Sequence, residues 1–191
     1  MLIDTLSRKL IQRMLDKEII KFDDWEIYMF GLQLMISGVF KFIGFMIFAW
    51  ALGWIVEAFI FLVVFGLIRV SAGGYHAKSY LMCFITTGIM MTTAILLSKL
   101  FLSRFSVVGL TVVLMIASLM VILYAPVDSP NRRLTAKERK INRIRSLLTV
   151  FCLSAIALLT YLLFPQGLVF CNVAALAMLF ESITLAPIFA D

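Results

Sequence analysis

The sequence predicts an all-α integral membrane protein with six transmembrane helices, preceded by an amphipathic helix at the membrane interface. Of its 191 residues, 63% are hydrophobic and 15% are charged, whereas soluble domains contain roughly 45–50% apolar residues. A soluble core of this length could not hide so much apolar surface, but a bilayer can. The charges are also segregated, since the stretch 27–70 holds only Lys41, Glu57 and Arg69.

Apolar stretches of about 20 residues, the length that a spanning helix needs, recur along the chain. We expect spans near 29–52, 55–70, 79–98, 106–126, 146–164 and 167–188, all within one membrane domain, 1–191. Ahead of them, the apolar residues of the segment 2–21 fall in one wedge of a helical wheel. This pattern predicts an amphipathic helix. This helix either lies on the membrane surface or packs on the cytoplasmic ends of the spans.

The distribution of basic residues predicts the orientation in the membrane. An even number of spans puts both termini and the segments 71–78 and 127–145 on one side. The segment 127–145 alone carries seven basic and two acidic residues, whereas the opposite side has Lys99 and Arg104. By the positive-inside rule, the first side is cytoplasmic and 127–145 is a basic cytoplasmic loop. In so apolar a chain, topology explains this charge better than a nucleic-acid partner does.

The segment 69–83 contains the residues best suited to chemistry, among them the only histidine, His76, and Cys83. A cysteine nucleophile needs a base, and histidine is its usual partner. On one straight helix, residues seven apart are separated by about 10.5 Å along the axis, too far for a hydrogen bond. Gly73 and Gly74 tolerate positive φ, so we expect a non-helical loop around 71–78 that folds back over the third span. The pairing of His76 with Cys83 across a dimer interface is an alternative. A non-catalytic alternative is a plain loop histidine beside a packed cysteine.

Further polar residues near this end of the spans each allow two interpretations. Gln33 could donate to an oxyanion or form an interhelical hydrogen bond. Arg69 could hold a substrate carboxylate or anchor the topology. Glu181 could orient His76, or it could pair with Lys41 or Arg69.

The remaining candidates point to structural roles. Glu57, at the outer end of its span, is expected to be solvated, and Cys152 and Cys171 are expected to be packing residues. One histidine and scattered cysteines do not predict a metal site, and no motif predicts a cofactor.

Together these motifs resemble the accessory gene regulator protein B (AgrB) family, the membrane endopeptidases of Gram-positive quorum sensing. The resemblance covers nearly the whole chain. It lies in Gln33, in the pattern Arg69…Gly74-Tyr-His76…Cys83, in the sequence 124–126 (Tyr-Ala-Pro), and in the stretch 181–187 (Glu-Ser-Ile-Thr-Leu-Ala-Pro).

The resemblance implies a cysteine endopeptidase with Cys83 as nucleophile and His76 as base, in the plasma membrane of a Gram-positive bacterium. Its substrate would be an AgrD-like propeptide held at the lipid surface, whose C-terminal tail leaves an acyl-enzyme thioester that closes to a thiolactone or lactone. The resemblance also implies a homodimer. The basic loop would then dock the acidic tail, or serve topology alone. The alternatives are a peptide transporter without peptidase chemistry and a non-enzymatic membrane scaffold.

Overall fold

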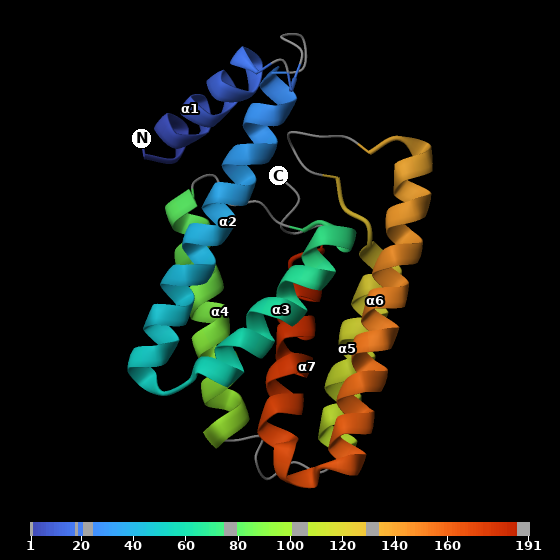
Figure 1. Ribbon diagram of the computed structural model, residues 1–191. Coiled ribbons are helices and arrows are strands. Elements are labelled where there is room, and N and C mark those ends of the chain that lie inside the picture. Colours follow the sequence, from blue (N-terminus) through green and yellow to red (C-terminus); the bar gives the residue numbers. More distant parts are fainter. Residues whose placement is uncertain are drawn as a thin grey trace. The chain divides into compact units, whose positions relative to one another are not determined.

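The computed structural model describes residues 2–17, 19–20, 25–74, 80–100, 107–128 and 134–186 (Figure 1). Within these ranges the regular structure is helical without strands, and six helices are long and apolar enough to cross a membrane, which confirms the predicted fold class. The helices are α1 (Leu2–Asp16), α2 (Trp25–Leu52), α3 (Ile55–Ala72), α4 (Tyr80–Leu100), α5 (Val107–Tyr124), α6 (Ala136–Leu163), the short 3₁₀ helix η3 (Pro165–Gly167) and α7 (Leu168–Ile183).

The chain divides into two compact units, Met1–Phe48 and Ala49–Asp191. In the first unit, Ile11 of α1 is buried in a cluster with Ile20 and Met29. Leu6 and Leu10, on another side of α1, are 42% and 37% exposed. The helix therefore packs within its unit and still presents apolar side chains outward.

The predicted amphipathic helix is shorter than expected. It ends at Asp16 rather than at residue 21. Beyond it, the N–H of Ile19 donates to the carbonyl of Met14, five residues back, at 2.9 Å. This wide turn closes the helix and satisfies one of its terminal carbonyl groups.

In the second unit, α7 is the central helix and packs against α3, α4, α5 and α6 (Figure 1). Many of its buried side chains are small, including Ala175, Ala177 and Ser182, and small residues let membrane helices approach closely. The outer helices expose large apolar side chains such as Val108 and Leu162. Such an outer surface is suited to lipid, so the burial within the unit is concentrated around α7.

The segment 127–145 is not one loop, because α6 begins at Ala136 rather than near residue 146. Thr135 and Glu138 form a capping box, in which the hydroxyl of Thr135 accepts the N–H of Glu138 and the Glu138 carboxylate accepts the N–H of Thr135. Asp128 accepts the N–H of Leu134 and pairs with Arg139. The second half of the basic segment is therefore a helical extension of α6. The sequence contains the signal for this start, since Thr-x-x-Glu is the pattern of a capping box.

The expected loop at 71–78 begins two residues later than expected, at Gly73, because α3 continues through Ala72. Gly73 has a φ of 79° and Gly74 a φ of 128°, values that residues with a side chain rarely adopt. A Cβ atom on Gly73 would lie 2.5 Å from the carbonyl oxygen of Val127, whose N–H donates to the carbonyl of Ala72 at 2.9 Å. The chain therefore leaves α3 in direct contact with the segment that follows α5.

Glu57 is buried, which corrects the expectation that it is solvated. Its Oε1 lies 2.6 Å from Nζ of Lys99 near the end of α4. The ammonium group of Lys99 also lies 5.6 Å from the ring centroid of Trp54. A buried carboxylate needs a partner of this kind, and the pair joins the start of α3 to the end of α4.

Candidate functional site

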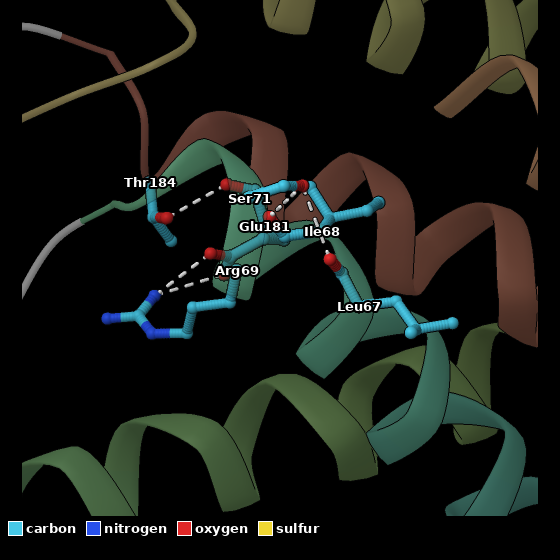
Figure 2. Close-up of polar contacts among 6 residues, drawn as sticks. All are labelled: Leu67, Ile68, Arg69, Ser71, Glu181 and Thr184. Atoms are coloured by element: carbon cyan, nitrogen blue, oxygen red, sulfur yellow. Dashed lines mark hydrogen bonds and ion pairs between the residues drawn. The ribbon is translucent and has the colours of Figure 1, made fainter. Parts of the chain in front are cut away.

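A buried ion pair connects α3 and α7 (Figure 2). Nη1 of Arg69, in the last turn of α3, lies 3.0 Å from Oε1 and 3.1 Å from Oε2 of Glu181. The Glu181 side chain is 0% exposed and that of Arg69 is 23% exposed. Because an unpaired buried carboxylate is costly, Arg69 is the partner that allows Glu181 to sit in the bundle. Of the interpretations considered for Glu181, the structure shows pairing with Arg69.

Neighbouring residues hold this pair in place. The guanidinium carbon of Arg69 lies 5.8 Å from the centroid of the Phe65 ring, one turn earlier on α3, which is a favourable cation–π distance. Thr184, just after α7, donates from its hydroxyl to the carbonyl of Glu181 at 2.8 Å (Figure 2). Arg69 is thus held between a carboxylate and an aromatic face.

The backbone of Gly74 passes directly beside the ion pair. A Cβ atom at this position would lie 2.6 Å from Oγ1 of Thr184, 3.0 Å from Oε1 of Glu181 and 3.2 Å from Nη1 of Arg69. A side chain at residue 74 would therefore collide with all three groups. The sequence predicted a loop-shaping role for Gly74 from its conformational freedom, and the structure adds this close approach as a second reason for glycine.

Cys83 and Arg69 line one small cavity of about 30 Å³. Cys83 is half-buried in the first turn of α4. A cavity of this volume holds about one water molecule or one small polar group. The other residues that line the cavity are Phe65, Thr86, Thr87, Met90 and Thr184.

The structure brings most of the predicted site residues in the second unit to one end of its bundle. Arg69, Gly74, Cys83 and Glu181 gather around the ion pair and its cavity. His76 lies outside the described residues, between Gly74 and the start of α4.

Gln33 belongs to the N-terminal unit. Its Nε2 donates to Oδ1 of Asp4 at 2.8 Å and links α2 to α1. This is an interhelical hydrogen bond, the predicted alternative to an oxyanion role.

The threonines of the site were not among the residues predicted from the sequence. Thr86, Thr87 and Met90 follow Cys83 at three, four and seven positions, the spacing of one helix face. That periodicity is readable in the sequence once Cys83 is taken as a reference point. Thr184 has no comparable signal, because its place depends on how α7 ends beside α3.

The fold and this site define a multi-pass helical membrane protein with a half-buried cysteine and a buried arginine–glutamate pair at one end of its bundle. The family model described as Accessory gene regulator B matches residues 4–185, so the chain belongs to the AgrB family. This family consists of membrane proteins that process a quorum-sensing propeptide of the AgrD type. No curated protein and no solved structure matches the chain.

Proposed function

We propose that this protein is a cysteine endopeptidase that removes the C-terminal tail of an AgrD-like propeptide, with Cys83 as nucleophile and His76 as general base and then acid. The main support is that Cys83 and Arg69 line one cavity, and that Gly74 packs directly on Arg69. His76 follows Gly74 by two residues, so covalent geometry alone keeps their Cα atoms within about 7 Å. Chain connectivity therefore keeps the candidate base, His76, in the region of the candidate nucleophile, Cys83.

The chemistry follows from these roles. His76 takes the proton of the Cys83 thiol, and the thiolate attacks the carbonyl carbon that precedes the tail. The tail leaves as an amine after it receives the proton from His76, and an acyl-enzyme thioester remains. An internal cysteine of the propeptide then attacks this thioester and forms a thiolactone, whereas a serine would form a lactone. The small volume of the cavity supports cyclisation over hydrolysis, because it leaves little room for bulk water.

The proposed topology places the site and both termini in the cytoplasm, where a new propeptide arrives, and the protein in the plasma membrane of a Gram-positive bacterium. The exposed basic residues at the start of α6 support this orientation and offer a docking surface for an acidic tail: Lys137, Arg139, Lys140, Arg143 and Arg145. The backbone hydrogen bond from Val127 to Ala72 connects the segment leading to α6 with the end of α3. Exposed Leu6 and Leu10 suit contact of α1 with lipid, and we extend the proposal to a homodimer.

The test is cleavage by the full chain in proteoliposomes that contain its cognate propeptide, with the C-terminal fragment measured by mass spectrometry. We expect Cys83→Ala to abolish the fragment. Cys152→Ala, at an exposed position of α6, and Cys171→Ala, in the core of α7, are matched controls that should retain cleavage. Cleavage that survives Cys83→Ala would refute the proposal.

Two further measurements separate the alternatives. Uptake of the propeptide into vesicles that persists in Cys83→Ala would instead favour a transporter. Unchanged processing in His76→Ala would favour a scaffold without enzymatic activity.

A further inference from the structure

Thr87 lies on the same inward face of α4 as Cys83. The two residues are four positions apart, which places their Cβ atoms about 5–6 Å from each other on a helix. Both are half-buried, and both line the cavity that Arg69 also reaches. Ile85 and Ile89, on the opposite side of the helix, are exposed. A hydroxyl group therefore stands one helical turn deeper in the bundle than the thiol.

The hydroxyl of Thr87 is available to a ligand in a way that its neighbour's is not. Thr86 donates to the carbonyl of Met82 at 2.8 Å, and Thr111 does the same to Val107 at 2.8 Å. Threonine hydroxyl groups within helices commonly donate to a carbonyl group of the preceding turn in this way. Among the described residues, none forms a hydrogen bond with the hydroxyl of Thr87. Its proton can thus be donated to a group that enters the cavity.

Two other candidate donors are already engaged. Nη1 of Arg69 is bound to the Glu181 carboxylate, and the Gln33 amide donates to Asp4 within the N-terminal unit. Thr87 therefore offers a neutral donor that faces the cavity beside the candidate nucleophile.

We infer that the hydroxyl of Thr87 donates a hydrogen bond to the oxyanion that forms when Cys83 attacks the propeptide, which makes Thr87 a further catalytic residue. This inference rests on the proposed function. As the bond from sulfur to the carbonyl carbon forms, the π electron pair moves onto the oxygen, and Thr87 stabilises that charge without giving up its proton. When the oxygen lone pair restores the double bond, the carbon–nitrogen bond breaks and the amine leaves with the proton from His76. A donor fixed in a site with little water stabilises such a charge strongly.

Valine substitutions provide the test, because valine keeps the shape of threonine but lacks the hydroxyl. In the full chain, reconstituted with the propeptide, Thr87→Val should lower kcat by about 10²–10³-fold with KM changed little. Thr87→Ser keeps a hydroxyl and should recover to within about tenfold of the native kcat. Thr111→Val removes a hydroxyl that is bonded to the preceding turn of α5 and lies outside the cavity, so its kcat should stay within about threefold of the native value.

A second readout separates oxyanion stabilisation from a role in folding or in activating the thiol. Iodoacetamide alkylates Cys83 by displacing iodide, a step that forms no oxyanion, so Thr87→Val should be alkylated at Cys83 at the native rate. Equal kcat values for Thr87→Val and Thr111→Val, with Cys83→Ala inactive, would overturn this inference alone. A parallel loss of alkylation in Thr87→Val would also overturn it. Cleavage by Cys83→Ala would overturn the proposed function and this inference together.

Discussion

Arg69 and Glu181 are 112 positions apart in the sequence, yet one guanidinium nitrogen contacts both carboxylate oxygens, at 3.0 and 3.1 Å. The pair ties the last turn of α3 to the last turn of α7, the central helix of its unit. Gly74 packs directly on it. The segment that leads to His76 therefore begins in contact with the ion pair.

Removal of one partner of this pair should be strongly destabilising. Glu181→Ala leaves the Arg69 guanidinium largely buried without its carboxylate, so the free energy of unfolding should fall by about 3 kcal/mol. Glu181→Gln keeps an acceptor oxygen and should cost less. Reversible unfolding in bicelles measures both changes. In a double-mutant cycle with Arg69→Met, the two single changes should not add. Additivity to within about 0.5 kcal/mol would show that the two side chains are not coupled.

Gly74→Ala should disrupt the site without unfolding the bundle. The new methyl group would meet Thr184, Glu181 and Arg69 at 2.6, 3.0 and 3.2 Å, at a φ of 128°. We expect propeptide cleavage to fall by at least about 10²-fold, because a misplacement of about 1 Å near the reacting groups can cost that much.

Gly66→Ala, inside α3, is the matched control for Gly74→Ala. Its Cβ would meet nothing within 4 Å, so it should keep activity and gain about 0.5–1 kcal/mol of stability. Equal cleavage by the two variants would contradict the close packing at Gly74.

The sequence predicted the class of fold because spanning length and charge segregation are local properties of the chain. It also predicted that the helix breaks near Gly73, since a glycine pair marks positive φ. It could not choose between Lys41 and Arg69 as the partner of Glu181, because helix periodicity does not tell which faces of distant helices meet. The expectation that Glu57 is solvated was wrong for the same reason. Its position at the end of a span indicates solvent, but the end of α4 covers it with Lys99.

The pair of Glu57 and Lys99 should support stability and not catalysis. Along α3, Glu57 lies about 18 Å from Arg69. Substitution of Glu57 should therefore leave the cavity beside Arg69 unchanged. Glu57→Ala should lower the free energy of unfolding by about 2 kcal/mol, because it leaves the ammonium group without its partner. Lys99→Arg preserves the charge and the contact with Trp54 and should be nearly neutral. Unfolding and cleavage per folded molecule are measured together. A fall in kcat for Glu57→Ala would contradict this separation.

Gln33 tests whether the N-terminal unit supplies a catalytic group. If its amide serves only to join α2 to Asp4 of α1, then Gln33→Ala and Asp4→Ala should each weaken the docking of α1 by about 1 kcal/mol. The double variant should lose little more than either single one, and all three should cleave the propeptide with the same kcat. Hydrogen exchange of the α1 amides measures the docking.

Gln12→Ala removes a comparable bond, from Gln12 to Asp16 within α1, and should leave the contact with α2 intact. A loss of about 10² in kcat for Gln33→Ala but not for Asp4→Ala would instead make Gln33 an oxyanion donor, since only the direct contact with the reacting carbonyl group would then be missing.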